Sequence, residues 1–170
     1  MPFDAAGTRF IQFLHFDAGS VNLGHLRFGA EHDDQVHGFH RVLGQELGTF
    51  GSDVDALCEQ ADAVVVPVLP SALDIDATVG FLNTLAKHPA VRRGQTRVGL
   101  VANRLRPWTN ASQQAVTLLE QWPYPVVAQL RDSQAYVMLV GLGRSLFDYH
   151  SAQVRDHQSD WAPLLKWLRK

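Results

Sequence analysis

The sequence has one cysteine, no long hydrophobic run and few lysines. Its one cysteine, Cys58, excludes an internal disulfide and fits a reducing compartment. No stretch approaches the roughly 20 apolar residues of a membrane-spanning helix. The first residues, MPFDAAGTRF, have neither the basic nor the apolar region of a secretory signal. These absences predict a cytoplasmic protein with no membrane span.

The scarcity of lysine excludes a common kind of phosphate site. The three lysines are Lys87, Lys166 and Lys170, and the other permanently charged cations are all arginines. No Gly-Lys dipeptide occurs in the 170 residues, and no lysine precedes position 87. The glycine-rich loops that bind nucleotide phosphates usually carry a Gly-Lys pair. The N-terminal half therefore has no conventional phosphate loop.

The bulk composition is that of one ordinary globular domain. The chain is 46% hydrophobic and 19% charged, and at 170 residues it can bury about 70% of its unfolded surface in one core. The formal net charge of -2 creates no strong field toward DNA or membranes. Five arginines cluster in the sequence at positions 92, 93, 97, 104 and 106. A solvated rim explains them better than a polyanion site, so we expect no nucleic-acid partner.

Short apolar segments rich in β-branched or aromatic residues predict four strands. These are Phe10–Phe16, Ala63–Val68, Arg97–Ala102 and Pro125–Leu130. Helical periodicity predicts five helices, at Asp53–Gln60, Leu73–Lys87, Ala111–Trp122, Ser133–Leu142 and Ser159–Lys170. Because strand and helix alternate, the predicted fold is α/β, a single-domain three-layer sandwich with a mostly parallel sheet flanked by helices.

Two of the predicted helices carry an apolar face. In the second helix, the apolar residues that recur every four positions are Leu73, Ala77, Phe81 and Leu85. In the last helix, the apolar stripe consists of Trp161, Leu164, Leu165 and Leu168. Packing against the sheet explains this last stripe more simply than a groove for a partner.

Three blocks of sequence, in the same order, resemble the second half of the ParA/MinD-type P-loop ATPases. ADAVVVPVLPSALDIDA, residues 61–77, resembles the strand, turn and helix that follow the family's switch region. VGLVANRLRP, residues 98–107, resembles its late strand ending in Asn-Arg, and LRDSQAYVMLVGLGRSLFDY, residues 130–149, resembles its I-R-x-x-x-A-[FY] segment. The matching region is 53–150. The resemblance implies a P-loop NTPase-like fold, with a shortened nucleotide-loop region at 1–52 and a C-terminal helix at 151–170.

The resemblance also implies that Asn103 and Arg104 descend from residues that contact the nucleotide base. Asn103 ends an apolar strand, and ligands of open parallel sheets bind at the carboxyl ends of the strands. Its side-chain amide offers a donor and an acceptor to a purine edge. The alternative is that Asn103 only caps or turns the chain before Pro107, and both interpretations stay open.

The family's phosphate loop, which resembles K-G-G-x-G-K-T-T, should follow the first strand. The stretch in that place is FIQFLHFDAGSVNLGHL, residues 10–26. Aligned with the family, it puts Asp17 at the signature lysine, Asn22 at the second lysine and Val21 at a glycine. An aspartate repels phosphate, and a valine resists the positive φ that glycine allows. The residues of this degenerate loop are Asp17, Gly19, Ser20 and Asn22.

A second alignment stays open, because FDAGSVNL, residues 16–23, also resembles the end of the family's next strand. In that alignment the phosphate loop is absent altogether, and Asp17 is the remnant of a metal-side or switch aspartate. We prefer the first alignment, because a sheet needs its central strand more than its edge. Both alignments disable phosphate binding. The candidate magnesium segment, residues 41–53, has no aspartate at the end of an apolar strand, so magnesium ligation is not expected.

Three other kinds of site are not favoured by the sequence. Five of the eight histidines lie between positions 15 and 40, but their spacing matches no HExxH zinc motif. Cys58 lies in a helical pattern, which favours a buried structural thiol over a nucleophile. Ser20 is not part of a G-x-S-x-G nucleophile elbow. We therefore expect no metal site and no catalytic residues.

The sequence as a whole predicts a degenerate ParA/MinD-like protein that does not hydrolyse ATP, although the resemblance leaves ATP and Mg²⁺ binding possible. Its role would be that of an accessory or regulatory binding partner in bacterial partitioning, positioning or assembly. The expected associations are a protein partner and an ATP-independent homodimer. Two alternatives stay open: an active nucleotide-binding ATPase with an unorthodox phosphate site, and a truncated gene product without a dedicated role.

Overall fold

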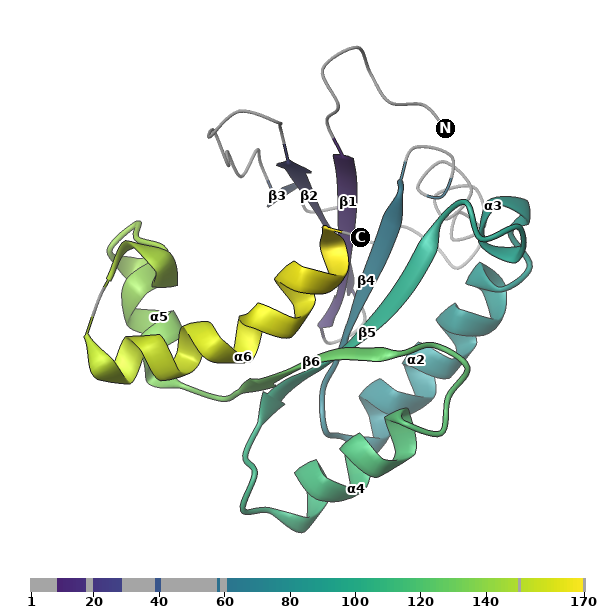
Figure 1. Ribbon diagram of the computed structural model, residues 1–170. Coiled ribbons are helices and arrows are strands. Elements are labelled where there is room, and N and C mark those ends of the chain that lie inside the picture. The colour runs from purple at the N-terminus through teal and green to yellow at the C-terminus, as the bar shows by residue number, and fades with distance from the viewer. Residues whose placement is uncertain are drawn as a thin grey trace. The chain divides into compact units, whose positions relative to one another are not determined.

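The chain is divided by its contacts into two compact units. Figure 1 shows the computed structural model, which describes residues 9–17, 20–28, 39–40, 58, 61–149 and 151–169. The first unit comprises residues 1–68 and 73–99, and the second comprises residues 69–72 and 100–170. The boundary runs through strand β5 (Arg97–Leu105), so it does not coincide with a flexible linker. That the two units form a single domain stays a prediction.

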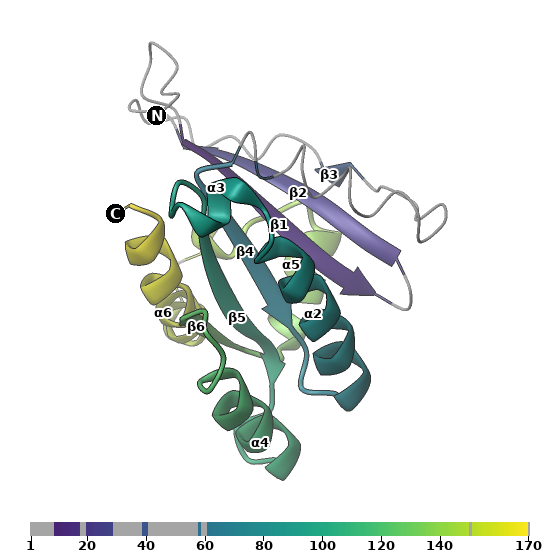
Figure 2. The same ribbon diagram turned by 90° about the vertical axis from the view of Figure 1, so that its right-hand side faces the viewer.

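The first unit is built on a long antiparallel hairpin. Its strands, in spatial order, are β3 (Phe39–His40), β2 (Ser20–Phe28), β1 (Arg9–Asp17) and β4 (Ala63–Val68). The pairs β3–β2 and β2–β1 are antiparallel, whereas β1 and β4 are parallel, with Ile11 opposite Ala63. Figure 2 shows β1 and β2 running side by side over their whole length.

Strand β2 corrects the sequence-based prediction for this region. The sequence analysis predicted a strand ending at Phe16 and then a loop, but residues 20–28 form a second strand that pairs with β1 from Ser20 opposite Asp17 to Phe28 opposite Arg9. The signal is present in the sequence, because apolar Val21 and Leu23 alternate with polar Ser20 and Asn22. The expected loop conformation of residues 20 and 22 is therefore wrong.

The buried strand β4 and helix α2 (Ala72–Leu85) supply the core of the first unit. β4 has the predicted bounds, and its side chains are buried except for that of the half-buried Pro67. The predicted apolar face of α2 is only half right, since Leu73 is 80% exposed and Ala77 is also exposed. The buried positions are Thr78, Phe81, Leu82 and Leu85. Thr78 can be buried because its hydroxyl donates a hydrogen bond to the Asp74 carbonyl, 2.6 Å away.

A buried threonine connects the segment before β4 to the start of β5. The Thr96 hydroxyl lies 3.0 Å from the carbonyl oxygens of both Cys58 and Ala61. The Arg97 N–H then donates to the Asp62 carbonyl at 3.0 Å, which begins β5 beside β4. Cys58 is helical and 2% exposed, so its predicted burial is confirmed. Between α2 and β5, the short helix α3 (Pro89–Arg92) is capped by His88, whose Nδ1 accepts from the Ala90 N–H.

The second unit combines the rest of β5 with a parallel strand and three helices. In chain order, the elements after β5 are α4 (Asn110–Leu119), β6 (Val126–Arg131), α5 (Gln134–Gly141), the 3₁₀ turn η1 (Leu146–Asp148) and α6 (Ala152–Leu168). Strands β5 and β6 pair in parallel from Leu100 opposite Val126 to Leu105 opposite Arg131. Parallel strands joined by helices confirm the predicted α/β class. Across the described ranges, no helix is long and apolar enough to span a membrane.

Helix α6 packs on β6 and α5, as Figure 1 shows, and is longer than predicted. Leu164 and Leu168 are buried and Trp161 is half-buried, so the predicted apolar stripe does face the core. The helix begins at Ala152, because the Ser151 hydroxyl caps it by accepting from the Val154 N–H. The sequence analysis placed the start at Ser159, because the first two turns are mostly polar and carry little apolar periodicity.

A bidentate ion pair fastens α6 to the end of β6. Arg131 Nε donates to Asp160 Oδ2 at 2.7 Å, and an η nitrogen of Arg131 lies 3.2 Å from Asp160 Oδ1. An η nitrogen also donates to the Asp156 carbonyl at 2.7 Å. The hydrogen bond to Asp160 is the main reason that the pKa of the Arg131 guanidinium is raised, while burial acts to lower this pKa. Paired, charge-assisted hydrogen bonds of this kind are stronger than single neutral ones.

We predict that Asp160→Ala lowers the free energy of unfolding by about 1–2 kcal/mol, because it removes both carboxylate contacts of Arg131. We expect no larger loss, because the Arg131 side chain is 38% exposed and water weakens the ion pair. Asp156→Ala is the matched control, since Asp156 hydrogen-bonds Arg131 through its backbone carbonyl, and its carboxylate adds only a smaller effect of charge. Urea unfolding of both variants measures the difference, and equal losses would contradict this account of α6 docking.

Candidate functional site

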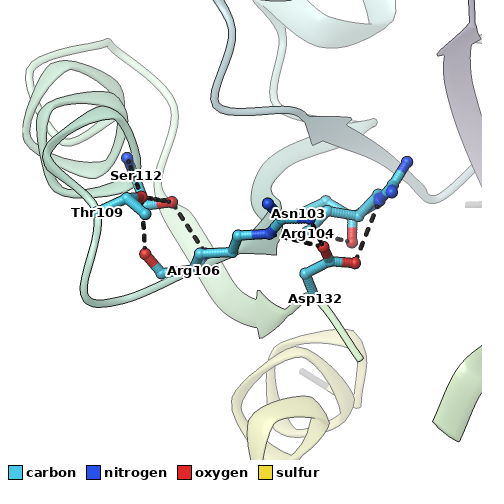
Figure 3. Close-up of polar contacts among 6 residues, drawn as sticks. All are labelled: Asn103, Arg104, Arg106, Thr109, Ser112 and Asp132. Carbon is cyan, nitrogen blue, oxygen red and sulfur yellow. Dashed lines mark hydrogen bonds and ion pairs between the residues drawn. The ribbon is translucent and has the colours of Figure 1, made fainter. Parts of the chain in front are cut away.

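The candidate site lies in the second unit, where β5 and β6 end. The two strands are parallel, so their carboxyl ends meet at one edge. β5 ends in Asn103, Arg104 and Leu105 and continues into Arg106, while Asp132 directly follows β6. The Asp132 N–H donates to the Leu105 carbonyl at 2.8 Å, which holds the two ends together. Figure 3 shows Asp132 facing the guanidinium groups of Arg104 and Arg106.

A β-bulge at Arg104 sets the direction of these side chains. Ala102 is opposite Gln129 and Leu105 is opposite Arg131, so β5 has one residue more than β6 between the two pairs. Arg104 has a φ of 52°, and no other non-glycine residue in the described ranges has a positive φ. The left-handed conformation costs a non-glycine residue about 1–2 kcal/mol. The Asn103 Oδ1 accepts the Arg104 N–H at 2.9 Å, which supports the bulge locally.

Asp132 is the electrostatic centre of the site. Its Oδ2 accepts from Arg106 Nε at 3.0 Å and from an Arg106 η nitrogen at 2.9 Å, and its Oδ1 lies 3.5 Å from Arg104 Nε. The hydrogen-bonded Arg106 guanidinium holds the pKa of the Asp132 carboxyl below its ordinary value, while partial burial opposes this and the Arg104 charge adds to it. Asp132 therefore stays ionised and fixes both arginines.

The loop between β5 and α4 is held by a small hydrogen-bond network, which Figure 3 also shows. The Arg106 N–H donates to Ser112 Oγ at 2.9 Å, and the Thr109 hydroxyl donates to the Arg106 carbonyl at 2.9 Å. Thr109 Oγ1 also caps α4 by accepting from the Ser112 N–H, and Gln113 Nε2 donates to the Pro107 carbonyl at 3.0 Å. The buried Ser112 anchors this network to the core. These hydrogen bonds restrain the backbone of the loop.

The chemistry that this arrangement offers is binding rather than proton transfer. Arginine does not deprotonate in proteins, and the lowered pKa of Asp132 makes that carboxylate a weak base. The Arg104 and Arg106 side chains are 64% and 60% exposed, so both guanidinium groups reach solvent while Asp132 orients them. Trp108, on the same loop, is 77% exposed. The site can bind anionic groups and an apolar or planar group beside them.

A second polar pair, Ser133 and His157, joins the start of α5 to α6. Ser133 Oγ lies 3.0 Å from His157 Nε2 and accepts the Ala135 N–H at 3.2 Å. The His157 Nδ1 is buried and has no hydrogen-bond partner within the described residues. A buried N–H without an acceptor is costlier than a buried lone pair, so the proton belongs on Nε2, which donates to Ser133. With that tautomer, the hydrogen bond joins the start of α5 to α6.

The residues predicted from the sequence fall in both units. Asn103 and Arg104 are neighbours in the second unit, joined by the hydrogen bond from the Arg104 N–H, and this local contact matches the capping alternative for Asn103. In the first unit, Asp17 ends β1, opposite Ser20, and Asn22 lies on β2 opposite His15. Gly19 and most of the histidine-rich segment at 31–40 lie outside the described residues. That any of these residues binds a nucleotide stays a prediction.

Sequence reasoning missed the residues that organise the site. Asp132 is quoted within the third family-like block, yet its role depends on β5 and β6 ending side by side, which no local pattern reveals. Arg106 was assigned to a solvated rim, and strand alternation does not single it out, because Arg104 is left-handed and breaks the two-residue period. The Thr109 cap followed by Ser112 is a usable signal for the start of α4. In the described part of the chain, no His, Cys, Asp and Glu side chains gather into a group that could hold a metal.

Comparison with known proteins gives no identification. No family model matches the chain, and no curated protein matches it. The resemblance to the ParA/MinD-type ATPases therefore rests on the three sequence blocks.

We predict that Asp132→Asn removes an acid-sensitive part of the stability. A carboxyl whose pKa is lowered by folding contributes stability above its unfolded pKa, and that contribution is lost as the pH falls through the folded pKa. The wild type should therefore unfold at higher urea than Asp132→Asn at neutral pH, with the difference shrinking as the pH drops below the ordinary value of 3.8. Urea titrations at several pH values measure it, and a difference that does not depend on pH would refute the assignment.

We also predict that Arg104→Gly stabilises the fold by up to about 1 kcal/mol. Glycine relieves the left-handed strain of about 1–2 kcal/mol, while its extra unfolded-state freedom costs about 0.5–1 kcal/mol. The lost ion pair adds little because Arg104 is exposed. Arg144→Gly is the control, since Arg144 is exposed and lacks a positive φ, and it should be destabilising. Thermal and urea unfolding measure both variants, and destabilisation by Arg104→Gly would contradict the strain.

Proposed function

We propose that this protein is a non-hydrolysing, ParA/MinD-like binding protein of P-loop NTPase-like architecture. In this proposal it serves as an accessory or regulatory partner of another protein in bacterial partitioning, positioning or assembly. The observation that carries the proposal is the hairpin β1–β2, at the position where the family resemblance calls for the phosphate loop. The three sequence blocks and the α/β class supply the family part of the argument.

The hairpin matters because of what a phosphate loop requires. Backbone N–H groups close on the phosphates where a glycine-rich loop enters the N-terminus of a helix. Here β1 ends at Asp17 and β2 begins at Ser20 directly opposite it, and the two strands pair antiparallel along the hairpin. Residues 20–28, where the helix after a phosphate loop would begin, form a strand, and the chain has no lysine before Lys87. Both observations support the loss of ATP hydrolysis.

The site at the ends of β5 and β6 supports a binding role. Its fixed loop presents two exposed guanidinium groups and an exposed tryptophan, and none of these can act as a general base. Arginine and tryptophan are the residue types that most often dominate protein–protein binding energies. The same arginines favour the second candidate function, an ATPase whose phosphates are held by guanidinium groups instead of lysines.

We predict that the purified protein shows no Mg-ATPase activity above background, and that calorimetry detects no ATP binding. Any dimer should have the same stability with and without ATP, as measured by light scattering. Arg106→Ala is the decisive variant, because an ATPase activity that this substitution abolishes would establish the second candidate function. ATP hydrolysis that survives Arg106→Ala but is lost in Asp17→Ala would instead mean that Asp17 takes part in hydrolysis, as the metal-side or switch aspartate of the second alignment.

A further inference from the structure

Three largely exposed side chains lie at the end of β5 and on the loop that follows it. We call Arg104, Arg106 and Trp108 the Arg-Trp face. Trp108 exposes 77% of its surface, although an exposed tryptophan gains nothing from the hydrophobic core. The two arginine side chains are 64% and 60% exposed. The three residues lie within five consecutive positions, so both charges and the large apolar surface are close together along the chain.

The Arg-Trp face is held rigid by the residues beneath it. Asp132 orients both guanidinium groups, and Ser112 and Thr109 fix the backbone around Arg106. The Pro107 carbonyl accepts a hydrogen bond from Gln113, so the residue before Trp108 is fixed as well. A surface that is already ordered loses less conformational entropy when it binds, which favours affinity. The strained φ of Arg104 is a further sign that this geometry is maintained for a reason other than stability.

The charge of the face selects an anionic ligand. Two guanidinium groups face one carboxylate, so the cluster carries one net positive charge, and the exposed edges of the arginines suit a further carboxylate in bidentate geometry. The aromatic ring of Trp108 offers contact area to an apolar side chain next to that carboxylate.

We propose that the Arg-Trp face docks an acidic peptide segment of a partner protein, with carboxylates on Arg104 and Arg106 and an apolar side chain on Trp108. This inference rests on the proposed function as a binding protein and names the chemistry of its partner. A nucleic acid fits less well, because binding to a phosphate backbone depends on neutralising many phosphates. One net positive charge in the cluster, on a chain with a net charge of -2, does not provide that.

The experiment is selection from a random-sequence peptide library displayed on phage, with the immobilised full chain as bait. We expect the enriched peptides to contain Asp or Glu next to an apolar residue. The best of them, made as a labelled peptide, should bind about tenfold or more weakly to Trp108→Ala and to Arg104→Gly, as measured by fluorescence anisotropy. Arg104→Gly is informative because it is expected to be stably folded, so weaker binding does not reflect unfolding. Added salt should weaken the wild-type interaction.

Two substitutions elsewhere in the second unit serve as matched controls. Met138→Ala removes an apolar side chain that is 66% exposed, and Arg144→Ala removes an exposed guanidinium, and both should leave the affinity unchanged. Enrichment of peptides without acidic residues, no enrichment at all, or equal binding by the Trp108 variant would overturn the proposal. A labelled single-stranded oligonucleotide that binds the wild type and not the variants would also overturn it, in favour of a nucleic-acid ligand. ATPase activity, measured separately, tests the proposed function and does not affect this outcome.

Discussion

The connection between the ends of β5 and β6 is the constraint on which the second unit and its candidate site depend. The Asp132 N–H binds the Leu105 carbonyl, and the Asp132 carboxylate binds Arg106 and lies close to Arg104. The adjacent Arg131 is held by Asp160 of α6. Arg131, the last residue of β6, therefore fixes the last helix, and Asp132, the next residue, fixes the β5–α4 loop.

The N-terminal hairpin places a different constraint on function. Backbone groups that pair along β1 and β2 are not available to a phosphate, since each N–H donates once. Residues 20–28 are a strand, so they present no helix dipole to the end of β1. The missing lysines and the hairpin thus agree, although one is a feature of composition and the other of backbone geometry. This agreement is stronger support for lost hydrolysis than either observation alone.

The sequence predicted the parts of the fold that depend on local pattern. β4 has the predicted bounds because a run of valines after Ala-Asp is unambiguous, and β5, β6, α2, α4 and α5 differ from prediction by a few residues at their ends. β2 was missed because the family resemblance supplied a loop where Val21 and Leu23 indicated a strand. The first turns of α6 were missed because they are polar and their burial comes through His157. The site was found only in part, since Asn103 and Arg104 belong to a local motif, whereas Asp132 reaches them through tertiary pairing.

The bulge at Arg104 connects the fold to the proposed docking surface. Without the additional residue, successive side chains of β5 would point to opposite faces of the sheet as far as Leu105. The residues after Leu105 would then continue in the direction of the strand. The bulge shifts that alternation just before Arg106, while Asn103 and Asp132 hold the altered geometry in place. Glycine would adopt the same backbone at lower cost, yet it would offer no guanidinium group. The left-handed conformation of Arg104 is therefore better explained by the docking role that we propose than by the stability it adds.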